Sequence, residues 1–153
     1  MIFVSVGTTR TGFPRLINAL AALPAEKLSV QYGGSGPPAD AAEAVAFMSF
    51  EQVIDRMQAA AVVVCHAGVG TILCALRTGH TPVVVPRVKR LSERVDDHQS
   101  EFARALADQG KVIAVFDESR LAEAVALVPP RRESASPGEG PLHTAVRAAL
   151  LGR

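Results

Sequence analysis

The sequence predicts an α/β protein with a parallel sheet that is covered by helices on both faces. Two observations predict this class: short apolar runs alternate along the chain with segments of helical periodicity, and glycine or proline closes several of the apolar runs. Alternation of this kind is typical of a parallel sheet whose crossover helices pack on both sides. The length of 153 residues fits a single domain with a core of its own.

Each predicted strand is a short apolar run that is followed by a turn-forming residue or a polar segment. Gly7 follows the first run, the glycine-rich residues 33–36 follow the second, and Pro86 ends the fifth. The predicted strands comprise residues 2–6, 28–32, 44–47, 61–65, 81–85 and 111–116.

Helices are predicted where apolar residues recur at helical spacing, as Val53, Ile54 and Met57 do before the fourth strand. Gly79 and Gly110 stand where helices are expected to end, because glycine readily takes the left-handed conformation of a helix C-terminus. The predicted helices comprise residues 13–23, 50–60, 71–78, 98–109 and 121–128.

The remaining segments are expected to be a long loop and a C-terminal extension. Residues 87–97 are charged and aperiodic, and a connection of this length in an α/β protein indicates a functional role. Residues 129–141 are rich in proline, glycine, serine and charge, which predicts a mobile linker. We therefore expect one domain over residues 1–128, the linker, and a short C-terminal helix over residues 142–153.

Composition and charge exclude several classes of function. The formal net charge is +1, without the basic clusters of nucleic-acid-binding proteins, so no nucleic-acid partner is expected. No apolar run of the sequence is long enough to predict a membrane span. Cys65 and Cys74 are too few to bind a metal ion between them, so no metal is expected. Two cysteines of this kind indicate a reduced, cytoplasmic protein. No cofactor is expected either.

The segment 61–71, AVVVCHAGVGT, carries the clearest chemical signal. A predicted strand stops at Cys65 and His66, and small residues then lead into a helical pattern. The free N–H groups and the dipole of a helix N-terminus form an anion site, and glycine lets a phosphate approach the backbone. No Gly-Lys-Ser/Thr follows, and Leu73 stands at the last glycine of a dinucleotide fingerprint, so neither of those motifs is present. A turn without a ligand is the alternative interpretation.

The loops that follow the strands are expected to converge at one edge of the sheet. Ligands of parallel sheets bind at the carboxyl ends of the strands, which is where residues 7–9, 33–36, 66–71 and 87–99 are expected. The sequence therefore predicts a single site, and the glycine turn predicts a phosphorylated ligand.

In this order the motifs resemble those of the C-terminal, nucleotide-sugar-binding domain of glycosyltransferase family 28, over residues 1–128. Within that family the chain is similar to the small donor-binding subunits of two-part transferases, such as the cytosolic half of the eukaryotic dolichol-linked N-acetylglucosaminyltransferase and bacterial exopolysaccharide subunits. The matching motifs are FVSVGTT at 3–9, QYG at 31–33, HAGVGTIL at 66–73, AL at 75–76, Gly79, PVVVP at 82–86 and DHQ at 97–99.

The resemblance implies a Rossmann-like domain that is equivalent to the C-terminal half of a two-domain GT-B glycosyltransferase. It implies an inverting transferase subunit that takes N-acetylglucosamine or another hexose from a UDP-sugar to a lipid-linked acceptor. The other half would be a membrane-anchored partner subunit, which recruits the chain to the membrane and without which it is inactive. The alternative is a non-catalytic nucleotide-sugar-binding or regulatory module. A stand-alone α/β enzyme has less support, since the sequence has no Gly-x-Ser-x-Gly motif.

The resemblance also implies which residues bind the donor. The Gly-Thr-Thr loop and the His-Ala-Gly-x-Gly-Thr turn would face the diphosphate, and the Asp-His-Gln segment would face the sugar hydroxyls. The chemistry fits these roles, because fixed N–H donors at a helix N-terminus stabilise departing UDP and the amide of Gln99 can bind a pair of hydroxyls. The expected donor-binding residues are Gly7, Thr8, Thr9, His66, Ala67, Gly68, Val69, Gly70, Thr71, Asp97, His98 and Gln99.

Several of these residues also have a structural interpretation. Thr8 and Thr9 could cap a turn, Asp97 could cap the following helix, and His66 could satisfy buried backbone groups. The role of His98 stays open, and no catalytic base is identified.

Other polar residues are expected to serve the surface. His80 and His143 are expected to be exposed. The charged loop has four basic residues that could attract an anion, although solubility is the expected role of most of them: Arg87, Lys89, Arg90 and Arg94.

One residue departs from the family pattern. The family commonly has glutamate where this chain has Cys74, and that carboxylate is expected to hold the ribose hydroxyls of the nucleotide. A thiol cannot accept two hydroxyl groups with comparable strength. We therefore expect uridine recognition to be weaker or different in this chain.

Overall fold

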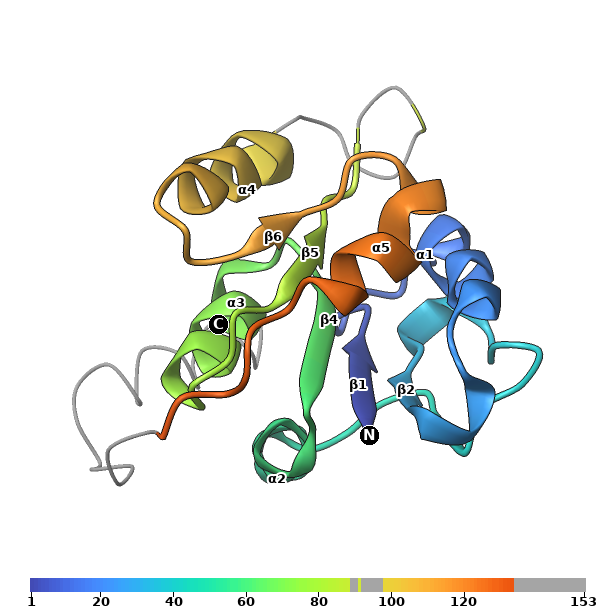
Figure 1. Ribbon diagram of the computed structural model, residues 1–153. Coiled ribbons are helices and arrows are strands. Elements are labelled where there is room, and N and C mark those ends of the chain that lie inside the picture. Colours follow the sequence, from blue (N-terminus) through green and yellow to red (C-terminus); the bar gives the residue numbers. More distant parts are fainter. Residues whose placement is uncertain (89–90, 92–97, 134–153) are drawn as a thin grey trace.

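Six parallel strands form one sheet in the part of the chain that the computed structural model describes, residues 1–88, 91 and 98–133. The strand order is β3-β2-β1-β4-β5-β6, and each neighbouring pair runs parallel. This arrangement confirms the predicted α/β, Rossmann-like fold. The strands are β1 Ile2–Ser5, β2 Leu28–Gln31, β3 Glu43–Val45, β4 Val62–His66, β5 Val83–Val85 and β6 Ile113–Ala114 (Figure 1).

Helices cover both faces of this sheet, because successive side chains of a strand point to opposite sides. Val4 of β1 joins a core cluster with α1 and α5 on one face, whereas its neighbour Phe3 packs against α2 and α3 on the other. Helix α4 joins α3 on that second face through Ala103. The described α-helices are α1 Pro14–Ala19, α2 Phe50–Ala59, α3 Val69–Arg77, α4 His98–Asp108 and α5 Leu121–Ala126 (Figure 1).

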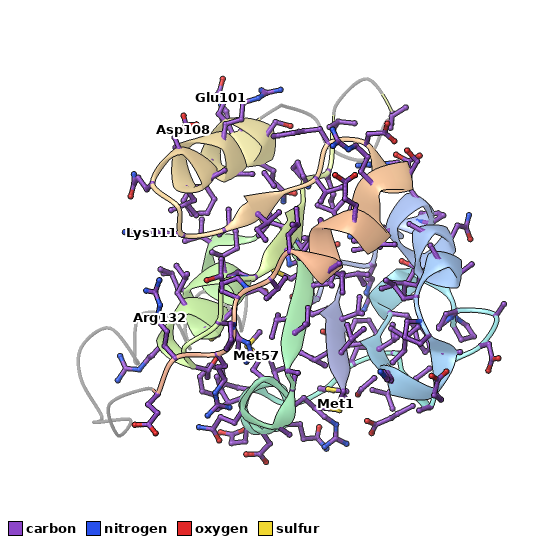
Figure 2. All side chains as sticks on the ribbon, viewed as in Figure 1. Met1, Met57, Glu101, Asp108, Lys111 and Arg132 are labelled. Carbon is purple, nitrogen blue, oxygen red and sulfur yellow. The ribbon has the colours of Figure 1, made fainter. Side chains whose placement is uncertain are left out.

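Local sequence explains how these helices begin and which face they bury. At the start of α2, Ser49 and Gln52 form a reciprocal capping box: each side chain accepts a hydrogen bond from the other's backbone N–H group, at 3.2 and 2.9 Å. On α4, Ala103 is buried, whereas Glu101 and Asp108 point away from the sheet (Figure 2). The charged side of α4 therefore faces solvent, and its small apolar side faces the core.

The strand order reverses at β1, which has β2 on one side and β4 on the other. Its last residue, Ser5, is paired with Gln31 of β2 and with Cys65 of β4. The segments that leave β1 and β4 therefore start side by side at the carboxyl edge of the sheet. Open α/β sheets bind their ligands at this switch point.

Some element boundaries differ from those predicted. The helix predicted over residues 13–23 ends at Ala19 and continues as a 3₁₀ turn over Leu20–Ala22. The helix predicted from residue 71 begins at Val69, because the first N–H groups of a helix need no intrahelical partner and small residues are tolerated there. Strand β6 is shorter than predicted, since it can pair only with the short strand β5.

Residues 129–133, at the start of the predicted linker, run back along the end of α3 (Figure 1). The N–H group of Arg132 donates to the carbonyl of Gly79 at 2.9 Å, and the guanidinium of Arg131 donates to the carbonyl of Gln58. The remainder of the predicted linker and the predicted helix over residues 142–153 lie outside the described residues.

The prediction that His80 is exposed is wrong. Its side chain is buried, and its Nε2–H group donates to the carbonyl of Met57 at 2.6 Å. Burial lowers the pKa of His80 below its ordinary value; the hydrogen bond to Met57 opposes this shift in part, and the nearby charge of Arg131 adds to it. The imidazole is therefore held neutral beneath the end of α3.

This burial predicts a pH dependence of stability. The unfolded chain takes up a proton at His80 near its ordinary pKa of 6.5, whereas the folded chain resists protonation until a lower pH. The contribution of His80 is therefore complete above pH 6.5 and is lost as the pH falls towards the folded pKa. In urea titrations, the free energy of unfolding of the wild type should fall more steeply below pH 6.5 than that of His80→Gln. Parallel pH profiles would contradict this assignment.

Candidate ligand pocket at the carboxyl edge

A pocket of about 530 Å³ opens at the switch point, between the ends of β1 and β4 and the starts of α3 and α4. Its walls include every predicted donor-binding residue except Asp97, which lies outside the described residues. Two further residues line it that sequence reasoning did not assign to the site, Arg87 and Phe102. The sequence feature that indicates a place in the pocket for Arg87 is its position directly after Pro86, beyond the carboxyl end of β5.

The N-terminus of α3 forms one wall of this pocket. Gly68 is the N-cap, and Val69, Gly70 and Thr71 form the first turn. The first α-helical hydrogen bond runs from the Ile72 N–H group to the Gly68 carbonyl at 3.0 Å. The N–H groups that precede it lack intrahelical acceptors, and they lie at the positive end of the helix dipole. This wall therefore suits an anionic ligand.

His66 lines the pocket, and its ring fills the space beside two glycines. The ring is buried, and its Nε2 atom is 3.3 Å from the hydroxyl oxygen of Thr71. A Cβ atom on Gly68 would lie 2.2 Å from ring atom Cε1, and one on Gly7 would lie 2.6 Å from Nε2. Gly68, predicted to make room for a phosphate, thus also makes room for the imidazole.

A buried network of polar groups holds the loop that follows β1. Gly7 has a left-handed conformation, with φ +89°, which glycine adopts without strain. Its N–H group donates to Ser5 Oγ at 3.3 Å, and its carbonyl accepts from Gln31 Nε2 at 3.2 Å. Ser5 in turn donates to Gln31 Oε1 at 2.7 Å. The loop backbone is therefore fixed at the point where it enters the pocket.

The two threonines of this loop are exposed along the pocket wall. The Thr9 hydroxyl donates to the carbonyl of Thr11 at 3.3 Å, which agrees with the turn-capping interpretation of this residue. Thr8 shares with Gly7 and Thr71 a smaller adjoining cavity of about 80 Å³, which extends towards the start of α2.

The expectation that the basic loop residues mainly serve solubility is wrong for Arg87. Its side chain is buried, and its two terminal nitrogens donate to the carbonyls of Gly12 at 2.8 Å and Val6 at 3.2 Å. Its guanidinium carbon lies 4.6 Å from the centroid of the Phe13 ring. Of the described residues that line the pocket, Arg87 is the one with a permanent charge. Lys89, Arg90 and Arg94 lie outside the described residues.

The start of α4 contributes further residues to the lining of the pocket. Gln99 is half-buried, and its Oε1 atom accepts a hydrogen bond from the backbone N–H group of Arg87 at 3.1 Å. His98 is exposed at the pocket rim. One lone pair of the Gln99 amide is thus already used to hold the chain after β5, a contact that sequence reasoning did not foresee.

Cys74 does not line the pocket in the described part of the chain. Its thiol is buried in the apolar cluster that includes Phe3, Phe50 and Met57. Burial raises the pKa of the Cys74 thiol to about 12, so the group stays neutral. Cys74 therefore contributes packing and no charge.

Within the described residues, no group of three or more His, Cys, Asp and Glu side chains is placed to hold a metal ion. No helix in the same part of the chain is long and apolar enough to cross a membrane.

The fold and the pocket together define a class of protein: a Rossmann-like domain whose switch point has a pocket and a helix N-terminus that suits an anion. The chain matches the family model of the Glycosyltransferase family 28 C-terminal domain over residues 1–138, and it belongs to this family. It is accordingly a glycosyltransferase domain with a nucleotide-sugar-binding role.

Proposed function

We propose that this chain is the donor-binding and catalytic subunit of an inverting glycosyltransferase. It takes N-acetylglucosamine or another hexose from a UDP-sugar and transfers it to a lipid-linked acceptor in polysaccharide or glycolipid synthesis. It works on the cytoplasmic side of a membrane, to which an anchored partner subunit recruits it. The observation that carries the proposal is the shared pocket of the α3 N-terminus, the Gly7–Thr9 loop and Arg87.

Electrostatics support a diphosphate in this pocket. The N-terminus of α3 presents N–H groups and a positive dipole end, worth about 0.3–1 kcal/mol for an exposed anion and up to about 2 kcal/mol in a partly buried site. Arg87, which also lines the pocket, adds a buried cation. During transfer the UDP oxygen gains negative charge as it departs, and donors that are already in place stabilise it without reorganisation.

Exposed apolar side chains at the same edge support a partner that covers the pocket. Phe47 follows β3, Val69 begins α3, and Leu91 lies between β5 and α4; their exposed fractions are 53%, 52% and 45%. Val69 lines the pocket itself, and the other two follow the carboxyl ends of strands, at the edge of the sheet where the pocket opens. Exposed apolar groups at the edge where a pocket opens fit a face that a second protein covers.

The buried thiol of Cys74 favours a second candidate, a nucleotide-sugar-binding or regulatory module without catalysis. The family's glutamate would offer the ribose a carboxylate, whereas this neutral thiol offers none. Titration with UDP, GDP and ADP separates the identity of the nucleotide from the question of catalysis, because a module of this kind would bind a nucleotide but never transfer a sugar.

Replacing Thr71 with valine should weaken UDP binding about tenfold while the fold stays intact. The change keeps the shape of the side chain but removes the hydroxyl that lines the pocket and contacts His66, and a hydrogen bond to a charged group is worth about 1.5–3 kcal/mol. Calorimetric titration of the full chain with UDP measures the effect.

Thr78→Val is the matched control for this experiment. Thr78 is a buried threonine at the other end of α3, whose hydroxyl donates to the carbonyls of Cys74 and Ala75. It should cost about 1 kcal/mol of stability and leave the affinity for UDP unchanged. If Thr71→Val and the wild type bind UDP with equal affinity, the proposal that this pocket binds the donor is contradicted. If the wild type does not bind UDP, UDP is not the donor nucleotide.

A further inference from the structure

Arg87 connects three segments that form the pocket. Its side chain starts directly after β5, reaches the loop between β1 and α1, and lies 98% buried, with an exposed fraction of 2%. Its backbone N–H group donates to Gln99 on α4. The residue is therefore in contact with the loop that carries Thr8 and Thr9 and with the first turn of α4.

The guanidinium closes the base of the β1–α1 loop. One terminal nitrogen donates to Val6, where the loop begins, and the other donates to Gly12, where it ends. The plane of the group lies near the Phe13 ring, whose own backbone N–H group donates to Ser35 Oγ at 2.6 Å. A planar fork can hold two carbonyls at once in a fixed geometry, whereas a lysine ammonium acts as a point charge.

We infer that Arg87 is a positioning residue, which holds residues 7–12 in the conformation that presents Gly7, Thr8 and Thr9 to the donor. The inference deepens the proposed function and rests on it. Its basis is that both ends of the loop are bound by one buried side chain from the segment that follows β5. Loss of the fork would leave the loop attached through the Ser5–Gln31 network at its start and through Ser35 at its end.

The test compares Arg87→Met and Arg87→Lys with the control Arg15→Met in the full-length chain. Arg15 also lies over Phe13, at 5.3 Å, and donates to the Pro86 carbonyl at 2.8 Å, but it is not among the residues that line the pocket. The affinity for UDP is measured by calorimetry at a temperature where urea titrations show every variant folded. The backbone amide signals of residues 7–12 are recorded by NMR without nucleotide.

Both Arg87 variants should bind UDP on the order of 10- to 100-fold more weakly than the wild type, and the amide signals of residues 7–12 should shift or broaden. Arg15→Met should match the wild type in both measurements. Wild-type affinity or unchanged signals in Arg87→Met would overturn the inference. Full recovery of affinity by Arg87→Lys would also overturn it, because charge without the fork would then be sufficient.

The two proposals fail in different ways. If the wild type does not bind UDP, the proposed donor is wrong, but the NMR comparison without nucleotide still decides whether Arg87 positions the loop. If Arg87→Met is unfolded, Arg87→Lys decides the same question, since it keeps a cation at this position and lacks the fork.

Discussion

Replacing Gly68 with valine is expected to abolish detectable UDP binding. A Cβ atom at this position would lie 2.2 Å from Cε1 of His66 and 2.8 Å from Nε2, so the ring must move. It has little room on the side of Gly7, where a Cβ atom would also approach the ring closely. Displacement of His66 breaks its contact with Thr71 and disturbs the first turn of α3, where the diphosphate is proposed to bind. Calorimetric titration with UDP measures the loss.

The same substitution should lower the free energy of unfolding by about 1–3 kcal/mol, as overpacking of a close-packed site does. A double-mutant cycle that combines Gly68→Ala with His66→Ala tests whether contact with the imidazole causes this loss of stability. Gly68→Ala should be destabilising in the wild type and much less so when the imidazole is absent. A folded Gly68→Val variant with wild-type affinity for UDP would show that this turn does not bind the phosphates.

The chain by itself is expected to transfer no measurable amount of sugar, whereas the same chain with its partner should be active. The pocket is open at the carboxyl edge, so water would weaken the stabilisation of the leaving diphosphate. Nothing would orient an acceptor, and orientation contributes about 7–11 kcal/mol to well-aligned reactions. The measurement is transfer of labelled sugar from UDP-N-acetylglucosamine and other UDP-hexoses to a lipid acceptor, with and without membranes that contain a candidate partner.

The activity that a partner induces must depend on this chain's own pocket. Gly68→Val should therefore stay inactive with the partner present, whereas Arg15→Met should be activated like the wild type. Rapid transfer by the isolated chain would refute the two-subunit proposal. Nucleotide binding without transfer, for every donor and partner tried, would favour the non-catalytic module.

Local sequence signals were sufficient to predict the order of the elements and the place of the pocket. Apolar runs and helical periodicity are local signals, and the strand–turn–helix unit from β4 to α3 is contained in residues 62–77. The rule that loops after parallel strands meet at one edge then placed Gly7, His66 and Gln99 together without knowledge of any side-chain contact. The pocket contains these residues as expected.

Which polar side chains are buried, and which groups bind them, depends on the packing of segments that are far apart in the sequence. In the sequence Arg87 is one of several charges in a basic loop. In the structure its side chain is buried and donates to carbonyls that lie 75 and 81 residues earlier in the chain. The sequence predicts that His80 is a surface histidine after a helix, but its imidazole donates to the carbonyl of Met57 on α2. Cys74 is likewise buried by residues of β1 and α2. Burial depends on segments that are distant in sequence and adjacent in space, and a local pattern contains no information about their distance.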